Sequence, residues 1–294
     1  MAWYAFEQGL YQKYGLAPEL LSVTGGSKAA AALIAKGADF CQMAGGSVAN
    51  AVGAGEDPVM IAGLYDKFLF ALVVGPSIQK PADLAGQSVA IGAAKGTKDT
   101  AARLGLKQLR LAPDSQVALV SFSDNDEAGM FAAVASGQVA GAVLSVPIPQ
   151  KMLAAGLHTM IDLSDIDYTY QRLGLASTRG FVAAHRDVAL GVVKASMEAI
   201  ARMKQDPDGT KKVLAKYLSL DTTNDAATLS ETYAVVVQKY LPSLPYPSKS
   251  GMQSVLTEAI ANNPALAKIT VDQLIDNSLV QELDSGGFVN SLGK

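Results

Sequence analysis

The sequence predicts an α/β protein that is built from two lobes. Its 294 residues are more than a single hydrophobic core usually organises. Apolar residues make up 49% of the chain and charged residues 17%, so folding can bury enough surface to offset the lost chain entropy. Predicted strands and helices alternate through the first half, an order that is typical of mostly parallel sheets with helices on both faces.

The first lobe is expected to begin with a helix and then to repeat a strand, loop and helix pattern. Apolar side chains three and four positions apart predict a helix over Trp3–Tyr14 that ends at Gly15. The elements expected after it are a strand over 19–23, a helix over 28–36, a strand over 39–43, a helix over 48–54, and strands over 59–64 and 70–74.

A proline-bearing connection after Pro76 is expected to lead into the second lobe. Its expected elements are a strand over 89–92, a helix over 98–109, a strand over 117–122, a helix over 127–136 and a strand over 139–144. An irregular stretch over 167–181 returns the chain to the first lobe. The helices expected there are 187–204, 208–218, 228–240, 249–262 and 271–282. We therefore assign residues 1–76 and 176–294 to lobe 1 and 77–175 to lobe 2.

Composition and termini exclude several classes of partner. The net charge is −3 and no run of Lys or Arg occurs, so we expect no nucleic acid and no anionic membrane surface as a partner. The longest apolar stretch, Phe68–Pro76, is too short to span a bilayer. The first residues lack the features of an export signal, which favours a cytosolic protein or one whose leader has been removed. The single cysteine, Cys41, is expected to pack as a small apolar residue.

Motifs for catalysis and for metal or nucleotide binding are missing. The two histidines, His158 and His185, belong to no HExxH or similar metal-binding pattern. The serine-bearing glycine loops lack a GxSxG elbow, and residues 92–98 lack the endings of a P-loop or a dinucleotide fingerprint. We therefore predict a protein that is not an enzyme, with no catalytic residue, metal or cofactor.

Four loops at predicted strand ends are candidates for ligand binding, because ligands in open α/β sheets bind beyond the carboxyl ends of the strands. They are Gly25–Ser27, Gly45–Ser47, Lys95–Thr97 and Ser123–Asn125. The third loop offers a helix N-terminus with unpaired amides, the Thr97 hydroxyl and the cations of Lys95 and Lys98. That loop is either a receptor for an anionic or polar group or an ordinary turn with solvated lysines. Similarly, Tyr65 is either a ligand wall or a packing residue.

Seven segments in order along the chain resemble the solute-binding proteins of ABC importers. The branch is the one that handles nitrate, sulfonates, taurine and thiamine-pyrimidine precursors, the NMT1/THI5-like and SsuA-like proteins. The segments are 7–16, 35–40, 65–68, 77–78 with 81–86, 137–147, 199–207 and 276–288. The resemblance implies a type II periplasmic binding fold, in which two doubly wound lobes are joined by a hinge of two crossovers.

The resemblance also implies a function and a set of site residues. It implies a monomer, periplasmic or extracytoplasmic, that closes on a small organic solute and delivers it to an ABC permease in the membrane. The solute is a sulfonate, a carboxylate or a heteroaromatic compound. The ligand-facing residues implied are Gly45, Gly46, Ser47, Tyr65, Lys95, Thr97 and Ser145, and the loops and the tyrosine-bearing return add Ser27, Asn125 and Tyr168.

Two departures and two alternatives accompany this prediction. Family members carry an export signal and a first strand before the helix that begins here within three residues of Met1, so one ligand-facing loop has no counterpart. The acidic residue that the family has near Ala140 is also missing. An enzyme on the same fold, resembling menaquinone-pathway enzymes or the fungal pyrimidine synthase, is one alternative. The synthase would need a histidine in the cleft and a cysteine-rich iron motif, and we predict neither. A ligand-sensing module is the other alternative.

Overall fold

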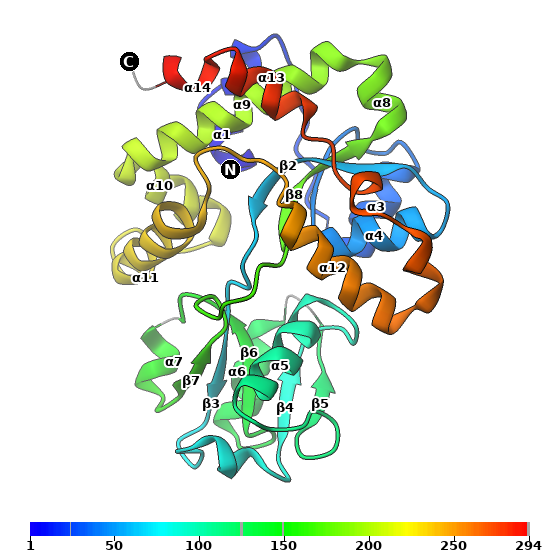
Figure 1. Ribbon diagram of the computed structural model, residues 1–294. Coiled ribbons are helices and arrows are strands. Elements are labelled where there is room, and N and C mark those ends of the chain that lie inside the picture. The colour runs from blue at the N-terminus through cyan, green and yellow to red at the C-terminus, as the bar shows by residue number, and fades with distance from the viewer. Residues whose placement is uncertain (24, 124–125, 149, 293–294) are drawn as a thin grey trace. The chain divides into compact units, whose positions relative to one another are not determined.

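The computed structural model describes residues 1–23, 25–123, 126–148 and 150–292, and the chain divides into two compact units. Unit 1 consists of Met1–Asp66 and Thr169–Lys294, and unit 2 consists of Lys67–Tyr168. The chain therefore passes from one unit to the other twice (Figure 1). Among the described residues, no helix is both long and apolar enough to cross a membrane.

The sheet of unit 1 is antiparallel in its described part. It contains β1 (Cys41–Met43), β2 (Pro58–Tyr65) and β8 (Leu173–Thr178) in the order β1-β8-β2. The central strand, β8, pairs antiparallel with both neighbours, with Met43 opposite Gly174 and Val59 opposite Ser177. A Cβ on Gly174 would lie 2.5 Å from the Ala62 carbonyl oxygen, so a glycine allows β8 to pack closely against β2. The expected mostly parallel sheet is therefore wrong for this unit.

Two expectations for the N-terminal segment are also wrong. The expected strand over 19–23 does not form, and Leu21 and Val23 are exposed there, because no described strand of the sheet pairs with this segment. The expected helix over 3–14 is divided into α1 (Ala2–Glu7) and α2 (Leu10–Lys13). The break lies at Gly9, whose φ of 63° is left-handed and cannot continue an α-helix.

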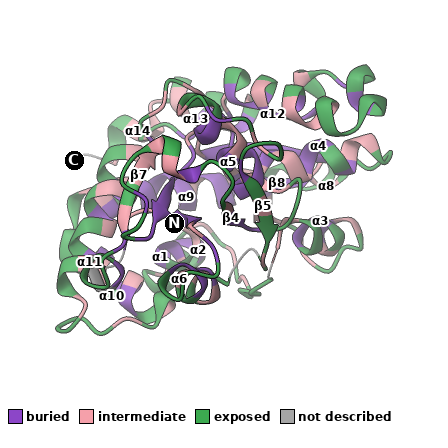
Figure 2. Cartoon of the chain, turned by 90° about the horizontal axis from the view of Figure 1, so that it is seen from below, coloured by how far each residue is buried: buried purple, intermediate pink, exposed green. Residues whose placement is uncertain are grey.

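Helices surround the sheet of unit 1 and match most of the expected ones. They are α3 (Gly26–Ile34), α4 (Gly45–Gly53), α8 (Arg179–Ala184), α9 (Arg186–Gln205), α10 (Pro207–Leu218), α11 (Ala226–Thr232), the π-helical η2 (Tyr233–Tyr240), α12 (Lys249–Asn262), η3 (Pro264–Lys268), η4 (Val271–Gln273), α13 (Ser278–Ser285) and α14 (Phe288–Ser291). The longest, α9, is buried along much of its length (Figure 2) and contacts α1, α2 and α13. Its buried side chains share one apolar core with Ile61 of β2.

Unit 2 is built on a mixed sheet of five strands in the order β5-β4-β6-β3-β7. The strands are β3 (Phe70–Val74), β4 (Ser88–Ile91), β5 (Ala118–Ser121), β6 (Gly141–Ser145) and β7 (His158–Asp162). Strand β4 pairs parallel with β5 and β6, whereas β3 pairs antiparallel with β6 and β7. The helical segments are η1 (Pro81–Leu84), α5 (Thr97–Gln108), α6 (Glu127–Ala135) and α7 (Gln150–Ala154). The parallel expectation therefore describes only one part of this sheet.

The unit boundaries differ from the expected lobe boundaries after residues 76 and 175. Strand β3 pairs over its whole length with β6 and so belongs to unit 2, which moves the first passage to residues 66–67. Strand β8 pairs with β1 and β2 and so belongs to unit 1, which moves the second passage to residues 168–169. Strand pairing, rather than the proline-bearing connection, determines where each unit begins.

The start of α4 is held close to the segment that enters β8. The Gly45 amide donates to the Gln171 carbonyl oxygen at 3.1 Å, and a Cβ on Gly45 would lie only 2.7 Å from that oxygen. The next residue, Gly46, has room, because its Cβ would meet the Tyr170 hydroxyl at 3.7 Å. Close approach of two backbones therefore requires glycine at position 45 and not at position 46.

A buried carboxylate joins the N-terminal helices to α9. Glu198 is 3% exposed, receives hydrogen bonds from Lys13 at 2.8 Å and from Tyr14, and is paired with Arg202. Burial by itself would raise the pKa of the Glu198 carboxyl. The hydrogen bonds from Lys13 and Tyr14 and the charge of Arg202 outweigh burial and hold this pKa below its usual range.

Replacing Glu198 with glutamine should destabilise the protein at neutral pH. A folded-state pKa below the unfolded one contributes stability above the unfolded pKa and loses it as pH falls through the folded pKa. We expect Glu198→Gln to lower the free energy of unfolding by about 1–3 kcal/mol at pH 7, and the difference to shrink below about pH 4. Urea denaturation at several pH values measures this. The control is Glu282→Gln, which removes the half-exposed pair with Arg186 and should cost less than about 1 kcal/mol.

The two glycines that begin α4 form a matched pair for a second prediction. Gly45→Ala forces the helix away from Gln171 and should lower the free energy of unfolding by about 1–3 kcal/mol. Gly46→Ala has space and a better helix former, so stability should stay within about 1 kcal/mol of the parent. Urea denaturation followed by circular dichroism distinguishes them, and equal losses in both variants would contradict the close approach at Gly45.

Candidate functional site

In unit 1, four of the predicted site residues lie close together at the N-termini of α3 and α4. They are Ser27, Gly45, Gly46 and Ser47, and the buried Tyr170 lies beside them. Ser47, in the first turn of α4, packs directly on Gly26, where a Cβ would overlap the Ser47 side chain. Ser27 follows Gly26 in the first turn of α3 and is exposed. Gly45 and Gly46 precede Ser47, and Tyr170, 5% exposed, lies against Gly46. The two glycine loops therefore lie next to each other, although only the second of them follows a strand, β1.

Gln171 organises this region, and sequence reasoning missed it. Its side chain is buried, and its amide nitrogen donates to the carbonyl oxygens of Tyr65 at 3.2 Å and Leu173 at 2.9 Å. Its amide oxygen accepts from the Ser248 backbone N–H at 2.7 Å. One side chain thus joins the end of β2, the start of β8 and the start of α12. A single glutamine in an irregular stretch carries no sequence signal for such a role.

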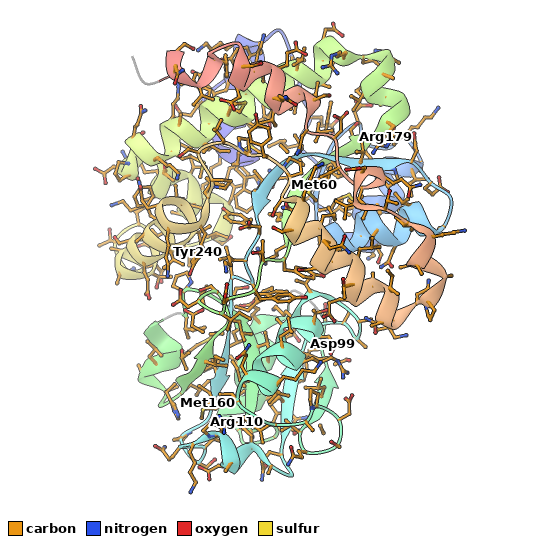
Figure 3. All side chains as sticks on the ribbon, viewed as in Figure 1. Met60, Asp99, Arg110, Met160, Arg179 and Tyr240 are labelled. Carbon is orange, nitrogen blue, oxygen red and sulfur yellow. The ribbon has the colours of Figure 1, made fainter. Side chains whose placement is uncertain are left out.

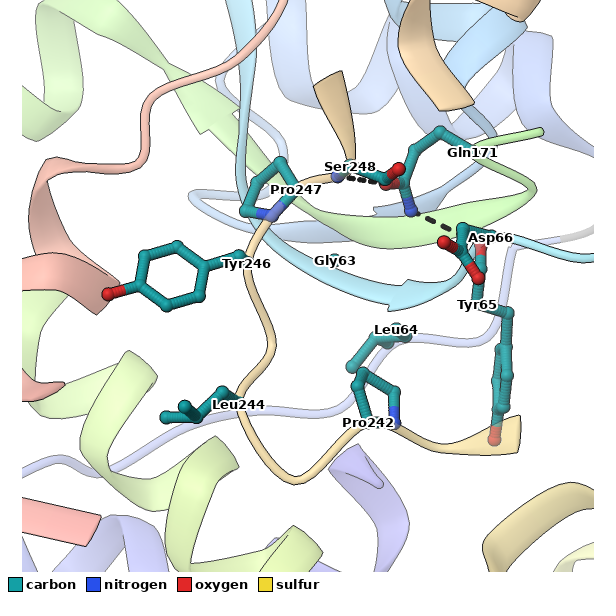
Figure 4. A pocket seen from close by; sticks show the side chains of 10 residues that line it. All are labelled: Gly63, Leu64, Tyr65, Asp66, Gln171, Pro242, Leu244, Tyr246, Pro247 and Ser248. Carbon is teal, nitrogen blue, oxygen red and sulfur yellow. Dashed lines mark hydrogen bonds between the residues drawn. The ribbon is translucent and has the colours of Figure 1, made fainter. Parts of the chain in front are cut away.

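A pocket of about 300 Å³ lies beside these hydrogen bonds in unit 1 (Figure 4). Its described lining comprises Gly63, Leu64, Tyr65, Asp66, Gln171, Pro242, Leu244, Tyr246, Pro247 and Ser248. Burial raises the pKa of Tyr65 to about 12, although the Arg172 cation opposes this. The Tyr65 hydroxyl is therefore neutral at physiological pH, so this side chain offers an aromatic face and a hydrogen-bond donor. The described wall therefore combines apolar side chains with several polar groups, which can orient a small molecule.

In unit 2, the loop over 95–97 differs from both interpretations of its sequence. The Lys95 amide is not available to an external anion, because it donates to the Asp99 carboxylate at 2.6 Å. Asp99 lies in the first turn of α5 (Figure 3) and is buried, where it also pairs with Arg103. The Lys98 side chain is 7% exposed and lies 2.7 Å from Glu127 Oε1, so it is not solvated. Two groups of the predicted anion receptor remain available to a ligand: the half-buried Thr97 and the exposed side chain of Lys95.

Glu127 connects the end of β6 with the starts of α5 and α6. This role, like that of Gln171, was not predicted from the sequence. Besides the Lys98 ammonium, its Oε1 accepts from the Ser145 hydroxyl at 2.6 Å and from the Ser145 backbone N–H at 3.2 Å. Ser145 is the last residue of β6. The Lys98 ammonium also lies 5.8 Å from the centre of the Phe70 ring. The position of Glu127 just after a loop indicates an acidic residue in the first turn of a helix. It gives no indication of the contacts with Lys98 and Ser145.

The remaining predicted residues divide between the two units. Tyr168, the last residue of unit 2, stacks on Phe68 with ring centres 6.2 Å apart, and nearby Lys67 donates to the Ile166 carbonyl oxygen at 3.0 Å. Asn125 lies outside the described residues. Five of the predicted site residues thus belong to unit 1, namely Ser27, Gly45, Gly46, Ser47 and Tyr65, and four belong to unit 2, namely Lys95, Thr97, Ser145 and Tyr168.

Known structures resemble this chain over nearly its whole length. The periplasmic aliphatic sulphonate-binding protein SsuA from Escherichia coli matches with a TM-score of 0.75 at 19% identity, covering 95% of this chain and 94% of that one. The periplasmic nitrate-binding protein NrtA from Synechocystis PCC 6803 matches with a TM-score of 0.75 at 16% identity, covering 97% and 85%. A cysteine-to-serine mutant of DszB, in complex with biphenyl-2-sulfinic acid, matches with a TM-score of 0.71 at 17% identity, covering 97% and 95%.

These structural likenesses confirm the predicted type II periplasmic binding fold. A search of curated protein sequences finds no match to the chain. A family model described as NMT1/THI5 like matches residues 2–210. Because this match spans well over half of the 294 residues, the chain belongs to the NMT1/THI5-like family.

Proposed function

We propose that the protein is the solute-binding component of an ABC importer, and that residues of both units contact a small organic solute. The observation that carries this proposal is that each unit has its own group of polar residues and helix starts at strand ends. In unit 1 this group adjoins a pocket of about 300 Å³, which is a size that suits a small organic molecule. Family membership and the binding proteins among the similar structures support the same function.

We also propose that binding closes the two units on the solute. The chain passes between the units at residues 66–67 and 168–169, and two short links are the usual basis of hinge closure. Each link borders a candidate site residue, Tyr65 or Tyr168. In unit 1 the two links are held side by side, because the Tyr170 N–H donates to the Asp66 carbonyl oxygen at 2.8 Å. A solute that contacts these tyrosines would therefore act next to the links.

The proposed partner is a membrane permease of the importer, which receives the solute. The proposed location is the periplasm or an equivalent extracytoplasmic space. Two proteins of similar structure, SsuA from Escherichia coli and NrtA from Synechocystis, are periplasmic binding proteins by name, which supports this location. The proposed solute classes are sulfonates, carboxylates and heteroaromatic compounds.

An enzyme on the same fold is the second candidate. The DszB complex supports testing it, because a cysteine of that protein was mutated in the complex with biphenyl-2-sulfinic acid, and cysteine is a common nucleophile in enzymes. In this chain the thiol of Cys41 donates to the Ala29 carbonyl oxygen at 3.4 Å, and burial raises the pKa of that thiol. A raised pKa disfavours the nucleophilic thiolate, so Cys41 is poorly suited to attack a substrate.

A thermal-shift screen of small organic solutes tests the proposed function. A solute that binds the folded state should stabilise it by about 2.7 kcal/mol at a hundredfold excess over its dissociation constant. The melting temperature should therefore rise with the logarithm of solute concentration, and mass spectrometry should recover the solute unchanged. If no organic solute raised the melting temperature, the binding function would be contradicted, and conversion of the best hit would instead favour the enzyme.

Two variants of the protein test whether Ser47 contacts the solute. Ser47→Ala should weaken binding of the best solute about tenfold, the effect of one lost hydrogen bond, without changing the melting temperature of the free protein. Ser230→Ala makes the same change at an exposed position of α11 and should leave affinity unaltered. Equal affinities in the two variants would remove Ser47 from the site.

A further inference from the structure

The Glu127 carboxylate receives the kinds of contact that usually hold an external anion. A lysine ammonium, a serine hydroxyl and a backbone N–H are the donors that proteins use for sulfonate and carboxylate groups. In this protein the ammonium of Lys98 and both donors of Ser145 point to Oε1 of Glu127. These three donors of unit 2 are therefore already occupied by an anion that belongs to the chain itself.

Burial makes this internal pair difficult to exchange for a ligand. The Lys98 side chain is 7% exposed and that of Glu127 is 30% exposed. An external anion would have to separate the two and leave the Glu127 carboxylate beside a second negative charge. Removing one partner of a buried ion pair is strongly unfavourable, because the other charge stays desolvated and uncompensated.

The neighbouring helix starts of unit 2 are supplied with carboxylates in the same way. Asp126 caps α6 by accepting from the Gly129 N–H at 2.9 Å, and Asp99 accepts from the Lys95 N–H at 2.6 Å at the start of α5. The chain therefore places its own carboxylates at both helix starts: Asp126 caps an amide of α6, and Asp99 accepts from the amide just before the N-cap of α5. The Lys95 side chain is a cation at this end of the unit, but it is exposed, so water and salt screen its charge.

The pocket of unit 1 gives an independent observation of the same kind. Among its ten described lining residues, Asp66 is the one with a charged side chain, and that side chain is negative. The amide nitrogen of Gln171 is already used, because it donates to the carbonyl oxygens of Tyr65 and Leu173. The described lining of this pocket thus contains a carboxylate and no cationic side chain, and the nearby Arg172 charge acts on Tyr65 from outside the lining.

Given the proposed solute-binding function, we propose that Glu127 makes the site selective for solutes that present N–H donors and against those that present a sulfonate or carboxylate. The contact of Glu127 Oε2 with the Ser145 N–H is 3.3 Å long, whereas the three donors to Oε1 are closer. Oε2 therefore retains the capacity to accept a hydrogen bond from an amine, an amidine or an amino-substituted heterocycle. This narrows the proposed solute classes to nitrogen-bearing compounds.

The test compares amines and amidines with acids of the same carbon skeleton. The probes are benzamidine, benzoate and benzenesulfonate, together with a panel of amines, amino-substituted heterocycles and their matched carboxylates and sulfonates. Their dissociation constants are measured by calorimetry on the whole protein. We expect the best nitrogen-bearing probe to bind at least about tenfold tighter than its matched acid, the effect of one charge-assisted hydrogen bond.

Two variants assign the preference to Glu127. In Glu127→Gln the preference should fall to about threefold or less, whereas Glu7→Gln, which removes an ion pair with Lys216 in unit 1, should leave it unchanged. The ranking in the parent protein decides the matter even if Glu127→Gln fails to fold. Acids that bind as tightly as their nitrogen-bearing partners would overturn the selectivity and leave the binding function intact. No binding by any member of the panel would overturn the binding function and the selectivity with it.

Discussion

The candidate site of unit 1 depends on the insertion of β8 between β1 and β2. The chain returns from unit 2 at Thr169 and at once forms the central strand of a sheet whose other strands precede the excursion. This pairing fixes the backbone just before β8, so that the Gln171 carbonyl oxygen meets the Gly45 amide and the Gln171 side chain reaches Tyr65 and Ser248. The start of α4, the end of β2 and the start of α12 are all positioned by it.

In the candidate site of unit 2, positive groups are paired with carboxylates of the protein itself. A helix N-terminus attracts anions because its amides and its dipole are positive. Here Asp99, Asp126 and Glu127 supply that negative charge from the chain itself. Such a surface needs no anionic ligand for stability. It therefore differs chemically from an open anion receptor with the same arrangement of strands and helices.

Local pattern predicted the elements whose signal is local. The helices α3, α5, α6, α9 and α12 and the strands β2, β3, β4 and β6 lie within a few residues of their expected positions, because apolar spacing and glycine stops specify them. Strand β8 was missed because its short run of small residues, Leu173–Thr178, acquires strand structure through pairing with distant segments. The antiparallel pairing of β3 was missed for a related reason, since strand direction depends on long-range topology.

In the candidate site too, features with a local sequence signal were predicted and features that depend on distant contacts were not. The positions of the Gly45–Ser47 loop after β1 and of Tyr65 at the end of β2 were predictable, but the strand expected before Gly25 does not form. The roles of Gln171 and Glu127 arise from contacts between residues far apart in the sequence. Lys98 was expected to be a cation that faces either a ligand or solvent, because sequence alone does not reveal its partner 29 residues away. A charge in a loop can be assigned to a ligand only after its internal partners are known.

In the proposed function, both units bind one solute and close on it. Small-angle X-ray scattering of the whole protein, with and without a saturating concentration of the best solute from the screen, tests this most directly. Closure should give a smaller radius of gyration in the bound state, reached at the solute concentration that saturates the thermal shift. A bound protein with the radius of gyration of the free protein would contradict closure.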